Sequence, residues 1–366
     1  ELWRSTLQSW LWLGVNDLRV DASGDVVTAG GAAQSNINLS QWSVEKTSGS
    51  TGARLWFQHV SPPTGNGAVE AIAIDHANDI LAFASRREET NPLSYVVKFS
   101  GTTGDVVWTT PIPYYFGPAP AQVATDALGN FYVSPRAAVL VKVLPDGTIG
   151  WTVNLQSSPG LNACAIRALK IDPVTSDAIV AGRANCDTTQ QAFAARIRGS
   201  DGDVVWAAAD VTDADTSDAV TIAFAAGGKV IVAGGQAATA QPQRWFAARL
   251  SLADGSVDWT VPVADETQHT ATDVAVGPGG EVLLSGVCDT NAFCAARLDG
   301  ATGARDWIAQ TGASYVPAAA NYPNTILASG GDVFFGGKDT SGAATTWTVH
   351  RIDNPAPDAI FANSLE

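Results

Sequence analysis

The chain has 366 residues, 46% of them hydrophobic, and its formal net charge at pH 7 is −15. A surface this acidic repels phosphate backbones, so the charge argues against a nucleic-acid partner. No run of 18 apolar residues occurs, so no membrane-spanning helix is expected. The 35 glycines and 18 prolines predict many turns, and therefore short strands rather than long helices.

The first two elements of each unit along the chain are β-rich runs. Several first runs end in an acidic residue, as in AIAID (71–75), QVATD (122–126) and ALKID (168–172). A second run then follows a turn that contains Gly, Asn or Asp. These second runs are predicted at residues 24–31, 78–85, 129–134, 177–182, 228–235, 280–286 and 331–337.

The third element of each unit is a run that ends in a basic residue. The seven basic residues are Lys46, Lys98, Lys142, Arg196, Arg249, Arg297 and Arg351. We expect their aliphatic stems to pack against a neighbouring sheet, because long cationic side chains cover apolar surface with their stems. Their charged heads are expected to meet the acids that end first runs, which are Asp21, Asp75, Asp126 and Asp172.

The fourth element carries a Gly-x-x-x-Trp motif. Its tryptophans are Trp56, Trp108, Trp151, Trp206, Trp259 and Trp307. We expect each of them to fill the gap between adjacent sheets, at one equivalent and largely buried position. A repeat of four short strands in about 50 residues cannot bury both faces of its own sheet, so neighbouring sheets must stack, and a ring achieves this without free ends.

The prediction is therefore an all-β, seven-bladed β-propeller of four-stranded antiparallel blades, a single domain over residues 1–353. The seventh unit lacks its Gly-x-x-x-Trp motif, but ELWRSTLQS (1–9) aligns with GWTVNLQS (150–157), which makes Trp3 the seventh repeat tryptophan. Residues 1–9 are expected to complete the C-terminal blade and close the ring. Residues 354–366 are expected to form a C-terminal tail.

Units such as WTVPVADETQHTATDVAVGPGGEVLLSGVCDTNAFCAARLDGATGARDW (259–307) resemble the bacterial seven-bladed β-propeller repeats called SBBP. They are similar, more loosely, to quinoprotein-type propeller repeats. The SBBP resemblance implies an exported protein of a Gram-negative bacterium, secreted or on the cell surface, in a family mostly of unassigned activity. The ending PDAIFANSLE is similar to tails of some exported gammaproteobacterial proteins. The absence of Met fits a mature, exported chain.

The four cysteines form no CxxC motif, and an even number in an exported protein predicts disulfides. We expect the pairs Cys164–Cys186 and Cys288–Cys294, because each pair lies within one unit. Cys164 and Cys186 lie on two loops that emerge on the same face, whereas Cys288 ends the second strand of the sixth unit and Cys294 begins its third, so that these strands run side by side. Quinoprotein dehydrogenases need adjacent cysteines, calcium ligands and a catalytic Asp. This chain has no adjacent cysteine pair, so that redox chemistry is not expected.

The acidic segment 210–218 is a candidate calcium site through Asp213, Asp215 and Asp218, and calcium is the one cofactor that the sequence suggests. The segment lacks the Gly and Glu of an EF-hand loop, so the alternative is a solvated loop at a strand end. The candidate ligand-binding residues are aromatic side chains outside the repeat positions, which can stack on sugars or seat a protein. They are Trp10, Trp12, Tyr114, Tyr115, Phe116, Tyr315 and Tyr322. The alternative is that these aromatics form the cores of their own loops.

The four histidines are scattered, and neither HExxH nor GxSxG occurs, so no catalytic residues are assigned and a non-enzymatic role is favoured. The leading hypothesis is a secreted binding or interaction module of a bacterial surface or extracellular matrix, with a protein or glycan partner. One alternative is a structural protomer that self-assembles into an extracellular fibre. The other is an extracellular polysaccharide hydrolase or lyase.

Overall fold

The structure is a computed structural model. It describes residues 11–33, 40–60, 66–87, 93–112, 121–135, 138–158, 160–186, 189–238, 243–263, 271–288, 292–314, 325–329, 332–339 and 346–353. The chain divides into two compact units. Unit 1 comprises 1–154, 171–176 and 199–202, and unit 2 comprises 155–170, 177–198 and 203–366.

Strands account for nearly all regular structure in the described residues. The first three sheets contain β1 (Leu11–Val20), β2 (Val26–Ala33), β3 (Ser40–Thr47), β4 (Arg54–Val60), β5 (Asn66–Ile74), β6 (Ile80–Arg87), β7 (Leu93–Phe99), β8 (Val106–Ile112), β9 (Gln122–Thr125), β10 (Phe131–Ser134), β11 (Val139–Val143) and β12 (Ile149–Asn154). A 3-10 helix, η1 (Leu155–Ser157), follows.

The remaining strands form four further sheets. They are β13 (Ala163–Ile171), β14 (Ala178–Ala184), β15 (Gln191–Ile197), β16 (Val204–Ala209), β17 (Thr216–Ala225), β18 (Lys229–Ala237), β19 (Arg244–Ser251), β20 (Val257–Pro262), β21 (Ala271–Val276), β22 (Val282–Cys288), β23 (Ala292–Leu298), β24 (Arg305–Ser314), β25 (Thr325–Ser329), β26 (Asp332–Asp339) and β27 (Thr346–Asp353).

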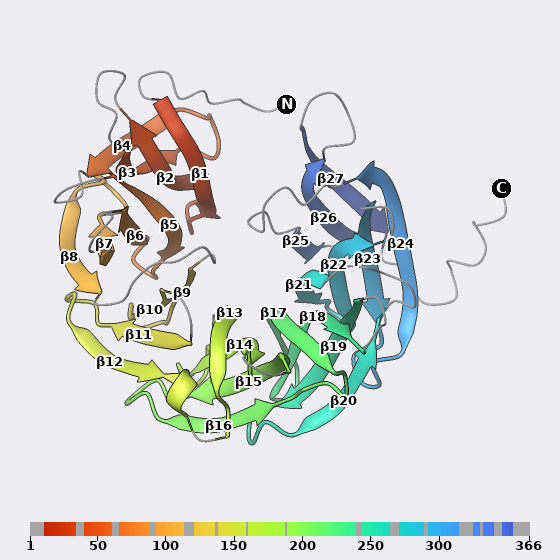
Figure 1. The fold of residues 1–366 in the computed structure, drawn as a ribbon. Coiled ribbons are helices and arrows are strands. Elements are labelled where there is room, and N and C mark those ends of the chain that lie inside the picture. Colours follow the sequence, from red (N-terminus) through yellow and green to blue (C-terminus); the bar gives the residue numbers. More distant parts are fainter. Residues whose placement is uncertain are drawn as a thin grey trace. The chain divides into compact units, whose positions relative to one another are not determined.

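The sheets follow the predicted four-strand order. Six of them are four-stranded with the strands paired in chain order, and the seventh contains β25, β26 and β27. Within unit 2, the first strands β17 and β21 contact each other, and the fourth strands β16, β20 and β24 lie on the opposite side of the unit (Figure 1). This is a β-propeller organisation, consistent with seven blades.

The register of the third and fourth strands confirms the alignment of the repeats. In each four-stranded sheet the repeat cation pairs with the repeat tryptophan, as in Lys98 with Trp108 and Arg196 with Trp206, and a bulge follows directly. The other four pairs are Lys46–Trp56, Lys142–Trp151, Arg249–Trp259 and Arg297–Trp307.

The repeat tryptophan packs against the glycine that opens the motif of the next sheet. Gly255 has a φ of +74°, and a Cβ there would lie 2.5 Å from the ring of Trp206. Trp206 is 8% exposed, and its indole N–H donates to the carbonyl of Leu252 in the next sheet at 2.9 Å. Trp108 and Trp151 occupy the same position but are only partly buried. The predicted equivalence is confirmed, whereas the predicted uniform burial is not.

Each core cluster lies between two successive sheets of one unit, as a propeller requires. In unit 1, Val27 and Val44 of the first sheet pack with Ile72 and Val97 of the second. In unit 2, Ile179 of the fourth sheet belongs to one cluster with Ile222, Val232 and Phe246 of the fifth. In the second, fifth and sixth sheets, apolar side chains on both faces therefore bind the sheet to its neighbours.

The repeat cations pair with acids, as expected, but the acid differs between sheets. The Lys46 ammonium lies 2.7 Å from Asp21, and the Lys98 ammonium lies 2.9 Å from Asp75, which are the predicted partners. The remaining pairs use acids at other positions of the repeat, namely Arg196–Asp177, Arg249–Asp258, Arg297–Asp306 and Arg351–Asp332.

Two of the predicted acid partners were wrong. Asp126 accepts hydrogen bonds from Asn130 and Tyr132, and the Lys142 ammonium donates instead to the carbonyl of Gly199 at 2.7 Å. Desolvation lowers the pKa of Lys142, and the negative charge of Asp126 offsets this only in part.

Asp172 accepts from the Val174 amide and the Thr175 hydroxyl in its own turn. Arg196 therefore pairs with Asp177, which directly precedes β14. Hydrogen bonds within its own turn already satisfy the Asp172 carboxylate, so the cation of the third strand pairs with another acid.

The predicted closure of the ring depends on residues 1–9, which lie outside the described residues, as does the predicted tail 354–366. No helix in the described part of the chain is long and apolar enough to cross a membrane.

Candidate functional site

Most of the predicted aromatic binding residues are not described by the structure. Trp10, the residues 114–116, Tyr315 and Tyr322 lie outside the described residues. Trp12 belongs to β1, but only its backbone is described and not its side chain. The hypothesis of an aromatic binding face therefore stays a prediction.

The predicted calcium ligands do not come together. Asp213 and Asp215 are exposed in the bend before β17, whereas the partly buried Asp218 lies within β17. Its carboxylate approaches the guanidinium of Arg167 in β13, with 3.6 Å between Oδ2 and Nε. Among the described residues, no group of three or more His, Cys, Asp or Glu is placed to hold a metal ion.

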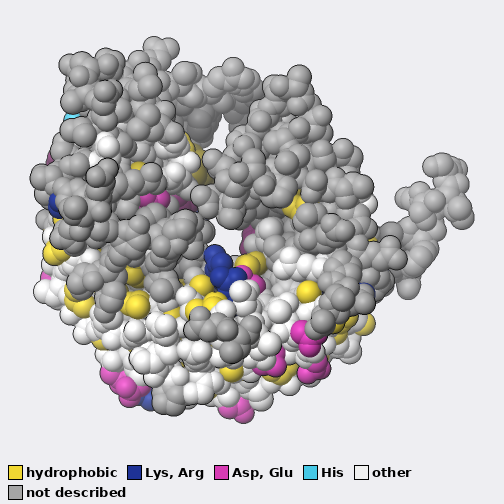
Figure 2. All heavy atoms as spheres, viewed as in Figure 1, with side chains coloured by type: hydrophobic (Ala, Val, Ile, Leu, Met, Phe, Trp, Pro, Cys, Tyr) yellow, Lys and Arg dark blue, Asp and Glu magenta, His cyan; other side chains and the backbone are white. Residues whose placement is uncertain are grey.

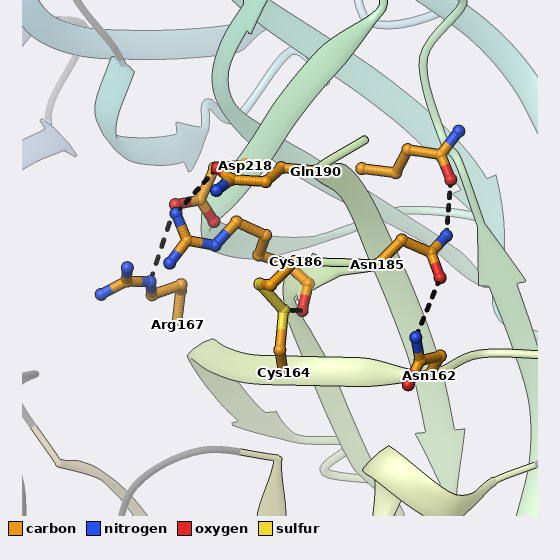
Figure 3. The surroundings of a disulfide bond; sticks show 9 residues. Asn162, Cys164, Arg167, Asn185, Cys186, Gln190 and Asp218 are labelled. Atoms are coloured by element: carbon orange, nitrogen blue, oxygen red, sulfur yellow. Dashed lines mark hydrogen bonds and ion pairs between the residues drawn. A yellow bond between two sulfur atoms is a disulfide. The ribbon is translucent and has the colours of Figure 1, made fainter. Parts of the chain in front are cut away.

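Asp218 instead marks a cluster of two arginines and one carboxylate, which we call the arginine cluster: Arg167, Arg183, Gln190 and Asp218. Arg183 lies in β14 and donates from Nη1 to Oε1 of Gln190 at 3.0 Å. Arg167 and Arg183 both interact electrostatically with Asp218. Figure 3 shows Arg167 and Asp218 pointing toward each other from strands of two successive sheets, beside Gln190.

Burial shapes the electrostatics of the arginine cluster. Desolvation raises the pKa of the Asp218 carboxyl above its usual value, and the charges of Arg167 and Arg183 offset this only in part. Three buried polar atoms, Asp218 Oδ1, Arg167 Nε and Arg183 Nε, have no hydrogen-bond partner within the described part of the chain. Buried polar atoms are normally hydrogen-bonded, so three unsatisfied atoms in one cluster are a departure from the usual rule.

The arginine cluster is nevertheless reachable from solvent. The side chain of Arg167 is 27% exposed and that of Asp218 is 23% exposed. Figure 2 shows basic side chains at the surface beside an acidic one in the region of β13 and β17. The cluster is therefore neither a closed core ion pair nor a fully solvated surface pair.

A disulfide fixes the strands that carry the two arginines. Cys164, in β13, is joined to Cys186, which follows β14, with 6.2 Å between the Cα atoms (Figure 3). The Cys164 sulfur also lies 3.2 Å from the carbonyl oxygen of Arg183. This confirms the first predicted disulfide. Cys294 is disulfide-bonded too, and Cys288, whose side chain is not described, is the remaining cysteine of the chain.

Side-chain amides extend the support on the other side of the disulfide. Asn162 donates to Asn185 at 3.3 Å, Asn185 donates to Gln191 at 2.7 Å, and Gln191 donates to Asp210 at 2.9 Å. The backbone carbonyl of Gln190 accepts from the amide at the second residue of β17, at 2.7 Å. These contacts hold β13, β14 and the start of β17 in one arrangement.

The arginine cluster departs from the residues that other sheets carry at the same positions. Five residues before the acid that ends the first strand, the first and second sheets carry Asn16 and Glu70, whereas the fourth carries Arg167. After the Ala-Gly of the second strand, Arg183 replaces the Gly31 and Gly235 of other sheets. Sequence reasoning missed both arginines, although departures from a repeat signal a site that architecture does not explain.

The fold is similar to several solved structures at low sequence identity. A quinohemoprotein alcohol dehydrogenase from Comamonas testosteroni matches with a TM-score of 0.57 at 12% identity, over 91% of this chain and 66% of that one. A europium-containing methanol dehydrogenase matches at 0.57 and 10% identity, over 89% of this chain and 73% of that one. Sqt1 of Chaetomium thermophilum matches at 0.54 and 10% identity, over 93% and 87%.

These likenesses show a β-propeller fold and nothing of the activity. The chain spans less than two thirds of the alcohol dehydrogenase that it matches. No family model matches the chain, and no curated protein matches its sequence. The resemblance to bacterial propeller repeats is therefore supported as a resemblance of fold.

Proposed function

We propose that this chain is a non-enzymatic binding module and that the arginine cluster is its ligand site. The observation that carries the proposal is the departure from the repeat at Arg167 and Asp218. Residues that build the propeller recur in successive sheets, whereas these two have no like-charged counterpart at their repeat positions. Arg183, whose position carries Lys338 in the seventh sheet, meets them where two successive sheets come together. Function is expected where one set of side chains departs from the architecture that the other sheets share.

The chemistry of the cluster supports binding. Guanidinium groups stay protonated at physiological pH, so they hold and orient an anion but do not transfer protons. The disulfide and the amide contacts hold the two arginine-bearing strands before a ligand arrives. Such preorganisation lowers the entropic cost of binding.

We also propose that the module acts at a bacterial surface or in an extracellular matrix. The Cys164–Cys186 disulfide offers modest support, because disulfides persist mainly in oxidising compartments. The net charge of −15 keeps the chain soluble and away from anionic polymers except where positive charge gathers locally. The arginine cluster is such a place.

The ring is proposed to close through residues 1–9, which would pair with β27 and bring the seventh sheet against β1. In the first strand of the second and fifth sheets, Ile72 and Ile222 are 0% and 2% exposed. Leu18, at the same register position of β1, is 50% exposed, and Val20 is 61% exposed. The residues at the position of Leu18 are buried in the other two sheets, so the exposed apolar side chains of β1 favour a further sheet that covers them.

Binding assays with variants of the arginine cluster test the proposal. The purified chain is applied to an array of bacterial glycans and to extracellular proteins, and each hit is examined for turnover. We expect binding that a double Arg167→Gln, Arg183→Gln variant loses. Arg19→Gln is the matched control, because Arg19 also pairs with an aspartate of its own strand, 3.2 Å away, but lies in unit 1.

Binding that survives the double variant would contradict the assignment of the site. Turnover of a bound polysaccharide would favour the hydrolase or lyase alternative. For that alternative, the raised pKa of Asp218 offers a group that can exchange a proton. Filaments in electron micrographs of the purified chain would favour the fibre alternative.

A further inference from the structure

We propose that the arginine cluster binds the carboxylate of a uronate sugar. This inference rests on the proposed binding function and names the class of ligand. A uronate is a sugar acid that joins one carboxylate to several hydroxyl groups. It occurs both free and within acidic polysaccharides, and its chemistry at the site is the same in either case.

The charges of the cluster favour a ligand with a single negative charge. Two guanidinium groups and one ionised carboxylate leave a net charge of +1, which a uronate carboxylate neutralises. A phosphate dianion would bring excess negative charge next to Asp218. Like charges at close range are unfavourable, particularly where burial weakens screening.

The polar atoms also favour a ligand that both accepts and donates hydrogen bonds. The arginines supply planar N–H donors, which match the two oxygens of a carboxylate. The amide nitrogen of Gln190 is a further donor, since its oxygen is engaged by Arg183. The Asp218 carboxylate, whose side chain is 23% exposed, is an acceptor beside these donors. A hydroxyl beside the ligand carboxylate can donate to it, which a simple carboxylic acid such as acetate cannot do.

The two arginines have different expected roles. Arg167 is held through one 3.6 Å contact with Asp218, so its remaining N–H groups can turn to a ligand. Arg183 is fixed at Nη1 by Gln190, and its own carbonyl lies against the disulfide. We therefore expect Arg183 to set the position of the carboxylate and Arg167 to close on it.

The test is calorimetric titration of the whole chain with a panel of defined compounds. The panel contains glucuronate, galacturonate, glucose, acetate, inorganic phosphate, a galacturonate oligomer and a polyglutamate peptide. We expect the two uronates to bind at least about tenfold more tightly than glucose, acetate or phosphate, since one charge-assisted hydrogen bond is worth roughly that factor. A gain in affinity for the oligomer would identify a polysaccharide as the source, and no gain a free sugar acid.

Variants locate the binding. Arg183→Gln is expected to weaken uronate binding at least about tenfold, and Arg167→Lys to weaken it less, because lysine keeps the charge but loses the planar fork. Arg19→Gln should leave the affinity unchanged. Melting curves of all variants show whether a loss of binding reflects unfolding.

Several results would overturn the inference. They are tighter binding of phosphate, equal or tighter binding of polyglutamate or acetate, uronate binding that is insensitive to both arginines, and no uronate binding at all. If the array then shows other ligands that depend on the arginines, the proposed binding function stands and the uronate inference fails. If nothing on the array or panel depends on the arginines, both fail.

Discussion

At the scale of single residues, the contact between a tryptophan and a glycine of the next sheet joins the blades. Trp206 lies over Gly255, and its indole N–H donates to the carbonyl of Leu252. The guanidinium of Arg196 donates to the same carbonyl at 2.7 Å. One backbone oxygen thus receives both repeat side chains of the preceding sheet. This explains why Trp and a cation recur together in the sequence.

Substitutions at this contact should be costly for a steric reason. Gly255→Ala would bring a methyl group into the Trp206 ring, in addition to the strain of a positive φ. Gly280→Ala is the control, because Gly280 has a φ of +86° but no atom within 4 Å of the added Cβ. We expect the control to cost about 1–2 kcal/mol of unfolding free energy and Gly255→Ala clearly more.

Truncating the partner tests the same contact from the other side. Trp206→Ala should lower the free energy of unfolding by about 3–5 kcal/mol, the usual range for a buried aromatic side chain. Urea-induced unfolding measures all three variants. A cost below about 1 kcal/mol for Trp206→Ala, or equal costs for the two glycine variants, would contradict the packing described.

Lys98 provides a prediction of pH dependence. Desolvation favours its neutral form, but hydrogen bonds and charges from Asp75 and Asp79, at 2.9 and 3.1 Å, outweigh desolvation and raise its pKa. A folded-state pKa above the unfolded value means that the ion pairs stabilise fully below the unfolded pKa of about 10.4. Their contribution is then lost as the pH rises through the folded-state pKa.

The unfolding free energy should therefore fall as the pH rises above about 10. Lys98→Arg should reduce this fall, because a guanidinium stays charged there and arginine occupies the equivalent position of other sheets. Lys98→Met should cost about 3–5 kcal/mol at neutral pH, since Asp75 would remain buried without its partner. Identical pH profiles for the wild type and Lys98→Arg would refute the assigned role.

At the scale of elements, the disulfide ties the start of β13 to the end of β14. A sequence separation of 22 residues corresponds to a stabilisation on the order of 3 kcal/mol in the chain-entropy account. Because the same strands carry Arg167 and Arg183, loss of the disulfide should also weaken ligand binding. Stability and binding are thus coupled through one cross-link.

The double variant Cys164→Ala, Cys186→Ala tests this coupling. We expect a lower melting temperature and weaker binding of whichever ligand depends on the arginines. Cys288→Ala, Cys294→Ala is the control, since a separation of six residues gives about 1 kcal/mol less stabilisation and lies away from the cluster. Peptide mapping without reduction should recover Cys164 linked to Cys186. Four free thiols would contradict the structure.

The strands could be predicted from the sequence, whereas several side-chain contacts between them could not. The alternation of turns and short apolar runs was sufficient to predict four strands per unit, because each strand is local in sequence. The partners of Arg196 and Lys142 were not predictable, because local turns and hydrogen bonds compete for the carboxylates of Asp172 and Asp126. The pairing of Arg167 with Asp218 joins two sheets, and only the folded chain brings them together.

At the scale of the whole molecule, the repeat accounts for the architecture better than for the function. Lys98 lies opposite Trp108, and Arg196 lies opposite Trp206. The same alignment places Arg351 opposite Trp3. It therefore predicts that His350 lies opposite Arg4. The proposed function rests instead on positions that depart from the repeat. The sequence predicted candidate sites of aromatic and acidic residues, whereas the site proposed from the structure is built around two arginines.

The pairing of residues 1–9 with β27 is tested most directly by a cross-link. Arg4→Cys with His350→Cys places two thiols on directly opposite residues, whose Cβ atoms are about 5 Å apart in an antiparallel pair. Arg4→Cys with Thr346→Cys is the control, because four residues along a strand add about 13 Å. Peptide mapping without reduction should show the new disulfide in the first variant and none in the second. Free thiols in the first variant, or equal cross-linking in both, would contradict a propeller closed by its N-terminal strand.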